Sequence, residues 1–151
     1  MKNRGFLIVK AYEEKNIVLP QRKTACSAGY DFAAAESVQI PPQSVSLVPT
    51  GVKAYMQADE YLGLHIRSGL AVRKNLMLVN GQGIIDADYY DNPDNEGHIM
   101  IAIYNPTTET VVIDAGERVA QGIFYHYLLA DDDNGTTVLR QGGFGSTGCK
   151  F

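Results

Sequence analysis

The residues best suited to chemistry lie in segment 80–90, which reads Asn-Gly-Gln-Gly-Ile-Ile-Asp-Ala-Asp-Tyr-Tyr. Glycine lets the backbone approach a ligand closely, and the segment then supplies two carboxylates, Asp86 and Asp88, and the phenol of Tyr89. The two carboxylates would point the same way if a strand continued through both. A carboxylate three residues before an aromatic ring, beside a glycine-rich bend, indicates a site that activates water near a flat ligand. The alternative is a hairpin with a solvated acidic rim.

A glycine-rich segment near the C-terminus, residues 142–148, could bind phosphate. Its backbone N–H groups and the hydroxyls of Ser146 and Thr147 suit phosphate oxygens, and Arg140 adds a guanidinium that can donate two hydrogen bonds. An exposed Phe144 gains nothing in such a segment unless its ring covers a flat ligand. The segment lacks the Gly-Lys-Ser/Thr ending and the following helix of a Walker loop. The alternative is a disordered Gly/Ser tail.

Three further groups of residues are weaker candidates. Segment 67–69 (Arg-Ser-Gly) would offer an anion its N–H groups, a hydroxyl and a guanidinium, but a capped turn with a surface arginine is the commoner alternative. Segments 27–31 and 116–121 fit turns that enter strands, although Gln121 interrupts an apolar run as a placed amide would. Three histidines have no metal-ligand partner at short spacing and are interpreted as ordinary: His65, His98 and His126.

Short strands must position these groups. Strand-like runs recur roughly every 8–12 residues between Pro, Gly and Asn turns, which predicts an all-β sandwich or jelly roll. Residues 118–129 form the longest predicted strand, with Gly122 as a bulge or bend, and residues 70–74 form the only predicted helical turn. The pattern ends at Ala130. Residues 1–129 are therefore predicted to form a β core, and 130–151 a mobile arm that orders on a ligand or a partner subunit.

Length and charge narrow the function classes. The 151 residues suffice for one domain with one sizeable core. A net charge of −4 argues against binding of nucleic acid, which needs a basic stripe. Cys26 and Cys149 have neither a disulfide-framework nor a metal-ligand spacing. With no signal peptide and no apolar run near the ~18 residues of a membrane span, we expect a cytoplasmic protein without membrane contact.

Five segments, together and in this order, resemble the motifs of the trimeric dUTPases (deoxyuridine 5′-triphosphate nucleotidohydrolases): 27–31, 66–71, 80–90, 116–121 and 142–148. The resemblance implies a jelly-roll subunit and a homotrimer whose active sites lie at subunit interfaces, each closed by a C-terminal arm. It also implies Mg²⁺ bound with the substrate triphosphate. The activity would hydrolyse dUTP to dUMP and pyrophosphate, which keeps uracil out of DNA and supplies dUMP for thymidylate synthesis.

The resemblance assigns roles around the reacting phosphate. Asp86 is similar to the general base that deprotonates the water attacking the α-phosphate, as a carboxylate ionised at neutral pH can. Asp31 and Gln121 resemble residues that order the metal-bound waters without direct ligation. The metal and a set of phosphate ligands would stabilise charge on the phosphoryl oxygens. By resemblance these ligands are Arg67, Ser68, Gly69, Arg140, Gly145, Ser146 and Thr147.

Other positions resemble contacts to the nucleoside. Tyr89 resembles the residue whose ring packs on deoxyribose and leaves no room for a 2′-hydroxyl, which would be costly to bury unpaired. Phe144 resembles a lid ring stacked on uracil. The uracil edge would be read by a tight hairpin and the following strand, through Asn80, Gly83, Ile84, Ile85 and Met100.

Two departures from many relatives leave alternatives open. Segment 91–97 (Asp-Asn-Pro-Asp-Asn-Glu-Gly) is longer and more acidic than the short turn that many relatives have at this place. It resembles a Gram-positive bacterial or phage variant and is interpreted as a solvated loop. Arg140 lies four residues before Phe144 rather than five. A dCTP deaminase of the same fold is the alternative enzyme, and it would need a group that protonates cytosine. A regulatory role, with a protein partner bound at segment 91–97, is the alternative of another class.

Overall fold

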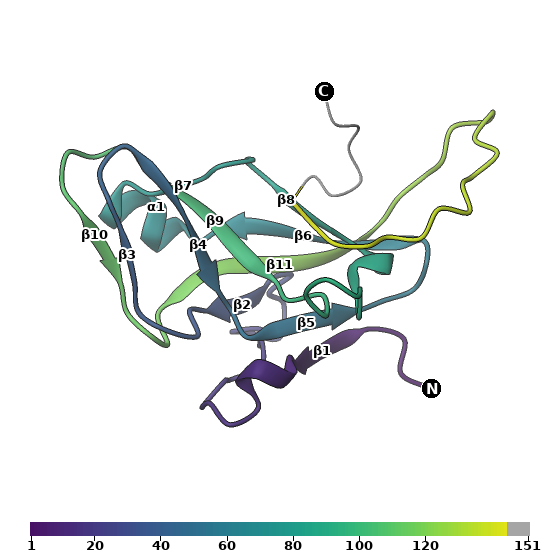
Figure 1. Cartoon of the computed structure of the whole chain (residues 1–151), viewed down its shortest axis with the longest axis horizontal. Coiled ribbons are helices and arrows are strands. Elements are labelled where there is room, and N and C mark those ends of the chain that lie inside the picture. Colours follow the sequence, from purple (N-terminus) through teal and green to yellow (C-terminus); the bar gives the residue numbers. More distant parts are fainter. Residues whose placement is uncertain (145–151) are drawn as a thin grey trace.

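The computed structural model describes residues 1–144, and most of its regular structure is β (Figure 1). The strands are β1 (Gly5–Ile8), β2 (Tyr30–Ala33), β3 (Val38–Ile40), β4 (Ser44–Pro49), β5 (Val52–Tyr55), β6 (Glu60–Ile66), β7 (Met77–Leu78), β8 (Gly83–Asp86), β9 (Met100–Asn105), β10 (Val111–Ile113) and β11 (Arg118–His126). One α-helix, α1 (Ser68–Lys74), and two 3-10 turns, Lys10–Tyr12 and Ala87–Tyr89, accompany them.

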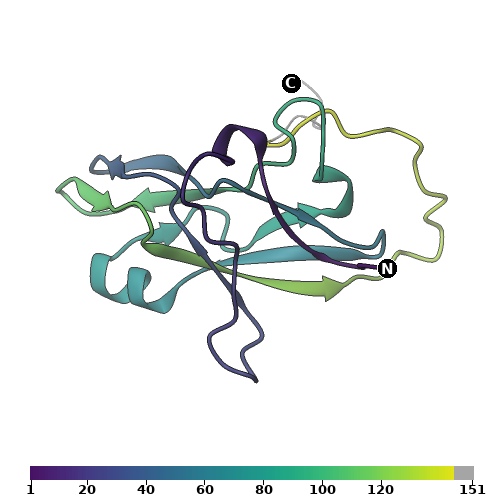
Figure 2. The same cartoon turned by 90° about the horizontal axis from the view of Figure 1, so that it is seen from below.

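The strands pair antiparallel into two larger sheets and two ribbons. The larger sheets have the orders β2-β11-β6-β8 and β4-β9-β7, and the ribbons are β1-β5 and β3-β10. The strands lie in two layers (Figure 2), with one apolar core between them. Side chains alternate along each strand, so one face of each sheet supplies the core. Core residues of the two larger sheets include Phe32, Leu62, Leu64, Val48, Ile101 and Ile103. The all-β prediction is confirmed.

Several local predictions need correction. Helix α1 begins at Ser68 rather than at residue 70, and neither 3-10 turn was expected from the pattern. Strand β11 ends at His126 rather than at residue 129. Its register shift lies between Arg118 and Ala120, not at Gly122. A Cβ at Gly122 would lie 2.7 Å from the ring of Phe32, so this glycine serves close packing rather than a bend.

The chain after β11 contains no helix or strand as far as residue 144, where the described part ends. This segment leaves the core and returns along β8 (Figure 1). It also contacts the loop 91–97, where the backbone N–H of Asp94 donates to the carbonyl of Gln141 at 3.2 Å. Its return brings Arg140 and Phe144 beside segment 80–90. No helix within residues 1–144 combines the length and the apolar character needed to cross a membrane.

Candidate active site

A cavity of about 400 Å³ gathers most of the residues that the sequence singled out. It opens beside β8, and its walls come from β8, the bend before it, the 3-10 turn after it, β9 and the returning C-terminal segment. The predicted site residues that line it are Asn80, Gly83, Ile84, Ile85, Asp86, Tyr89, Met100, Arg140 and Phe144. Gly145, Ser146 and Thr147, predicted to bind phosphate, lie outside the described residues.

The bend at 79–82 carries the chain from one sheet to the other. Leu78 of β7 pairs with Ile103 of β9, whereas Gly83 of β8 pairs with Leu64 of β6. The strands that flank the bend therefore belong to different sheets, and the predicted hairpin is a crossing between the layers. Strands β7 and β8 each end the strand order of their sheet, so the cavity lies where two sheet edges meet. An edge strand leaves one side of its backbone free to bind a ligand.

The two carboxylates of the site share one arginine. Strand β8 ends at Asp86, and a 3-10 turn follows, so the alternation that would align Asp86 with Asp88 stops there. Arg140 nevertheless reaches both: its Nη2 pairs with Asp86, and its Nε donates to Asp88 Oδ1 at 2.7 Å. The arginine side chain is only 16% exposed, while those of Asp86 and Asp88 are 50% and 58% exposed. Arg140 thus covers the predicted base in this arrangement.

Tyr89 is the most firmly held aromatic ring of the cavity. It is buried, and its hydroxyl donates to the carbonyl of His98 and accepts from Asn95 Nδ2, both at 2.8 Å. Burial raises the pKa of Tyr89, and the hydrogen bond from Asn95 opposes this only in part. Tyr89 therefore stays neutral at physiological pH. A Cβ at Gly143 would lie 2.8 Å from the Tyr89 ring, so the C-terminal segment passes in close contact with it.

Segment 91–97 is an ordered loop rather than a freely solvated one, which corrects the interpretation from sequence. Asn92 is buried, and its Oδ1 accepts from the backbone N–H groups of Asp94 and Asn95. Lys53 Nζ donates to Asp91 at 2.5 Å and to Glu96 at 2.6 Å, which fastens both ends of the loop to β5. The loop packs under Tyr89 through Asn92, whose Nδ2 donates to the Tyr89 carbonyl at 2.8 Å.

The remaining predicted site residues form a second cluster, away from the cavity lining. Asp31 Oδ2 accepts from Arg67 at 2.7 Å and from Arg118 at 3.1 Å. Gln121 stands directly opposite Asp31 in the pairing of β11 with β2. Ser68 and Gly69 open α1 next to Arg67, whose side chain makes no capping hydrogen bond. The arginine is therefore paired with Asp31, which disagrees with the alternative of a capped turn with a surface arginine.

This second cluster does not suit direct ligation of a divalent cation, because the guanidinium groups of Arg67 and Arg118 already pair with Asp31 and would repel a bare ion, so contact through water is the arrangement that fits. Both ion pairs of Asp31 use Oδ2, so Oδ1 remains the carboxylate oxygen suited to accept from water. Gln121 offers an amide oxygen on the neighbouring strand. Magnesium usually keeps several waters and takes few protein oxygens, with substrate phosphates supplying others. The donor set of Asp31 and Gln121 is thus compatible with the predicted indirect contact to Mg²⁺.

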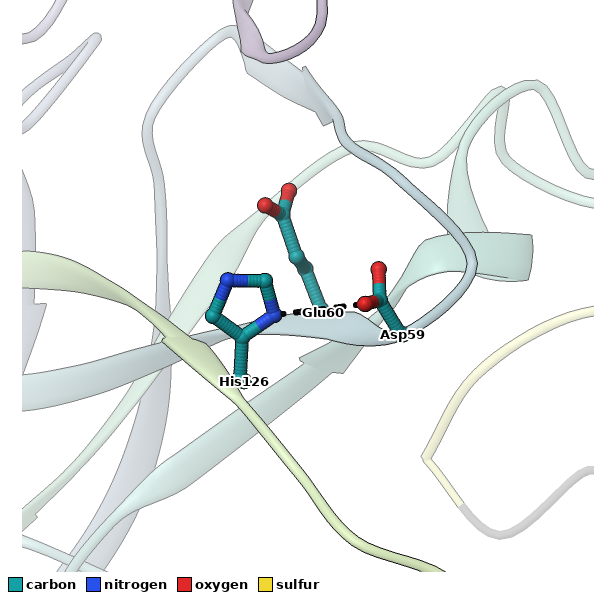
Figure 3. A group of neighbouring side chains, drawn as sticks. All are labelled: Asp59, Glu60 and His126. Carbon is teal, nitrogen blue, oxygen red and sulfur yellow. Dashed lines mark ion pairs between the residues drawn. The ribbon is translucent and has the colours of Figure 1, made fainter.

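Another group of possible metal ligands, Asp59, Glu60 and His126, serves as ion pairs instead (Figure 3). His126 Nδ1 lies 3.4 Å from Asp59 Oδ2. Glu60 is buried and already bound by Arg4, whose Nε donates to both of its carboxylate oxygens at 3.0 and 3.1 Å. Arg4 lowers the pKa of Glu60, and its guanidinium would repel a cation placed there. The ion pairs with Arg4 and between His126 and Asp59 explain why these side chains lie together without a bound metal.

Four residues matter to the geometry although no sequence pattern predicts a role for them. Gln82 and Gly143 line the cavity, Arg118 shares Asp31 with Arg67, and Asn95 holds the Tyr89 hydroxyl. Gln82, Arg118 and Gly143 lie inside motif segments, so their positions were a usable signal. Asn95 lies in the segment interpreted as solvated, and its partner is fixed only by the folded loop.

Comparisons with known proteins agree on one family. A family model described as dUTPase matches residues 15–148. The deoxyuridine 5′-triphosphate nucleotidohydrolase of Lactococcus lactis subsp. lactis is 52% identical over 149 residues, which cover 98% of this chain and 99% of that protein. The corresponding enzyme of Wolinella succinogenes is 34% identical over 137 residues, 88% of each chain.

Solved structures give the same result. The crystal structure of dUTPase from Streptococcus mutans superposes with a TM-score of 0.81 at 51% identity, covering 84% of this chain and 98% of that one. A dUTPase mutant from phage phi11 of S. aureus, described for its coordination of a structural Mg(II) ion, has a TM-score of 0.71 at 21% identity, with 86% and 94% covered. The phage protein shares the fold, and the jelly-roll-like prediction is confirmed by the Streptococcus match.

Proposed function

Because the chain belongs to the dUTPase family, we propose that it hydrolyses dUTP to dUMP and pyrophosphate by water attack at the α-phosphate. The observation that carries this proposal is the single cavity that brings together Asn80, Asp86, Tyr89 and Met100. These residues come from the bend before β8, from β8, from the 3-10 turn after it and from β9 of the other sheet. They supply polar groups for the nucleobase, a carboxylate for water and a buried ring for the sugar. The cavity volume of about 400 Å³ falls in the range of small-ligand pockets.

Uracil binds at the meeting of the two sheet edges. The free backbone edge of β8 and the amide of Asn80 present N–H and C=O groups that match the alternating donors and acceptors of the uracil edge. The backbone around Met100 closes the opposite wall, since this residue begins β9. Walls in contact with the uracil edge would leave little room for a 5-methyl group, which would disfavour thymine. Phe144, from the C-terminal segment, stacks over the base.

Tyr89 selects deoxyribose by packing its ring against the sugar. The ring is buried, with its hydroxyl fully engaged by Asn95 and His98, so it cannot offer a hydrogen bond to a 2′-hydroxyl. A ribonucleotide would bury that hydroxyl without a partner, at a cost of about 1–3 kcal/mol. UTP should therefore be a poorer substrate than dUTP.

Asp86 orients water and takes its proton. In the reaction the water oxygen bonds to the α-phosphorus, the bond from that phosphorus to the bridging oxygen breaks, and pyrophosphate leaves. Arg140 covers Asp86 in the free chain, but an ion pair with half-exposed carboxylates contributes only about 0–1 kcal/mol. The larger charge of a triphosphate can draw the guanidinium away, which frees Asp86 for water and places Arg140 on the phosphate oxygens.

Charge on the phosphoryl oxygens is stabilised by the second cluster. Arg67 and the opening of α1 at Ser68 and Gly69 offer a guanidinium, a hydroxyl and backbone N–H groups. Mg²⁺, when bound with the triphosphate, would neutralise charge on its oxygens. Asp31 and Gln121, opposite each other in the pairing of β11 with β2, would hold the waters of that ion. The guanidinium groups of Arg67 and Arg118 beside Asp31 suit a polyanion, although the net charge of the whole chain is negative.

A homotrimer joins the two clusters at subunit interfaces. In one chain, the cavity for the nucleoside and the Asp31 cluster for the phosphates lie in separate places, so neither forms a complete dUTP site alone. An exposed apolar face adjoins the cavity: Val45, Leu47 and Met77 are 51%, 44% and 55% exposed. Strand pairing sets Leu47 opposite Ala102, which lines the cavity. An apolar face continuous with a site favours burial against another copy, with residues 130–151 acting as the lid.

Pyrophosphate release from four nucleotides tests the proposal. Purified protein is incubated with dUTP, UTP, dTTP and dCTP, with and without Mg²⁺, and pyrophosphate and ammonia are measured. The expected result is Mg²⁺-dependent pyrophosphate release from dUTP and little from the other three. Ammonia from dCTP would instead indicate the deaminase, and no product from dUTP would contradict the proposal.

A further inference from the structure

The hydroxyl of Tyr89 is held at its far end by two hydrogen bonds. It donates to the backbone carbonyl of His98 and accepts from Asn95 Nδ2, both at 2.8 Å. A phenol has one hydrogen to donate, so these bonds fix both the position and the direction of the hydroxyl. The His98 carbonyl belongs to the backbone. Asn95 is therefore the side chain on which the orientation of the Tyr89 hydroxyl depends.

Asn95 is itself held by the loop around it. Its Oδ1 accepts from Asn92 Nδ2 at 2.7 Å and from the backbone N–H of Gly97 at 3.1 Å. Asn92 is buried and also donates to the Tyr89 carbonyl at 2.8 Å. The amide plane of Asn95 is thus set by its oxygen, which leaves its nitrogen aimed at the Tyr89 hydroxyl. A network in which each member is satisfied specifies one arrangement.

Lys53 anchors this network to the core. It is buried in β5 and bonded to Asp91 at 2.5 Å and Glu96 at 2.6 Å. These two carboxylates flank Asn92 and Asn95 in the sequence, so the lysine holds the loop at both ends. On the other side, Gly143 approaches the Tyr89 ring so closely that a Cβ there would lie 2.8 Å from it.

We propose that Asn95 is a specificity-determining positioning residue, which acts through the Tyr89 hydroxyl to hold the ring where a ribose 2′-hydroxyl does not fit. The inference rests on the proposed function, because it names what sets the sugar selectivity of that site. It also assigns a task to segment 91–97: the loop supports the sugar-facing wall of the cavity.

The expected effect of losing Asn95 concerns selectivity more than rate. Without its donor, the ring keeps the His98 bond but can tilt, which opens space at the sugar. One neutral hydrogen bond corresponds to a change of about threefold to tenfold. We expect the ratio of kcat/KM for dUTP over UTP to fall by about that factor, chiefly through better use of UTP.

The experiment compares Asn95→Ala, Asn95→Asp, Tyr89→Phe and the two double variants, with exposed Asn16→Ala as the control. Asn95→Asp keeps an oxygen for Asn92 and Gly97 and replaces the donor to Tyr89 by a charged oxygen that can only accept. Tyr89→Phe keeps the ring and removes the hydroxyl. Each variant is assayed for kcat and KM with dUTP and UTP, and for binding of dUMP and UMP by calorimetry.

Support requires two results. Both Asn95 variants and Tyr89→Phe lose selectivity by a similar factor, and the double variants lose no more than Tyr89→Phe alone, as groups in one interaction should. Full selectivity in Asn95→Ala, or additive losses in the double variants, overturns the inference. The ratio of the dUMP and UMP affinities measures sugar selectivity independently of catalysis. If the wild type prefers dUMP but releases no pyrophosphate from dUTP, only the proposed reaction is contradicted. A wild type that shows neither behaviour contradicts both.

Discussion

Replacing Lys53 by methionine should destabilise the protein and loosen the wall of the cavity at a distance. Lys53 is 8% exposed, and its ammonium is hydrogen-bonded to Glu96, whose side chain is 27% exposed, and to Asp91, at 51%. Burial alone would lower the pKa of Lys53, but these two hydrogen bonds outweigh it and raise the pKa. The folded state therefore favours the charged ammonium, and a methionine of similar length removes only that charge.

The magnitude follows from the exposure of the two partners. A hydrogen bond between charged groups contributes about 1.5–3 kcal/mol, and the Glu96 bond belongs in that range. The Asp91 bond is half exposed and adds at most about 1 kcal/mol. Removing the buried charge also relieves its desolvation, which offsets part of the loss. We expect the free energy of unfolding to fall by about 2 kcal/mol.

Urea unfolding at one fixed protomer concentration measures this change, because an oligomer's stability depends on concentration. Lys15→Met is the matched control, since Lys15 forms an exposed pair with Glu36 at 3.3 Å and should lose less than about 0.5 kcal/mol. Lys53→Met should also lower the selectivity for dUTP over UTP. Equal stability of the two variants would refute the anchoring role of Lys53.

Three other outcomes can be checked independently. Acid should destabilise the fold through His98, whose Nε2 accepts from the Gly51 N–H at 2.9 Å and whose pKa is lowered by burial. The unfolded chain therefore binds the proton more readily, and the free energy of unfolding should fall below about pH 6.5. Urea unfolding at a series of pH values measures this slope, which His98→Gln should remove. Gly143→Ala should lower kcat/KM for dUTP by at least about tenfold, because the added methyl meets the Tyr89 ring, while Thr136→Ala in the same segment should not. Hydrolysis in ¹⁸O-water should label dUMP and leave pyrophosphate unlabelled in mass spectra; label in pyrophosphate would contradict attack at the α-phosphate.

Local pattern was enough to place most strands and the segment that lines the cavity. The alternation of residues in β4 and β9 is a local pattern, and so is the spacing of glycines in segment 80–90. Both can be recognised from near neighbours in the sequence. The residues at which elements end were harder to predict from the sequence. Strand β11 stops at His126 although apolar residues continue to Leu129, because its pairing with β6 ends at Glu60 and only one further backbone bond follows in the described chain, from the Tyr127 N–H to the carbonyl of Asp59 at 3.2 Å.

Long-range partners could not be inferred from pattern. The ion pair of Arg140 with Asp86 joins residues 54 positions apart, and it places the predicted phosphate ligand on the predicted base. The crossing at 79–82 looks like a hairpin until β7 and β8 are seen to join different sheets. Segment 91–97 appeared solvated because its charges are visible in the sequence, whereas the buried lysine that pairs with Asp91 and Glu96 lies on β5.

The central claim is that Asp86 activates water in this cavity, and the comparison of Asp86→Asn with Asp88→Asn tests it most directly. Both carboxylates bind Arg140 and are similarly exposed, but only Asp86 lines the cavity. Single-turnover hydrolysis of dUTP with Mg²⁺ should slow by about 10²–10⁴-fold in Asp86→Asn, with dUTP still bound, and stay near the wild-type rate in Asp88→Asn. Turnover by Asp86→Asn within tenfold of the wild type, or an equal loss in both variants, would contradict the account.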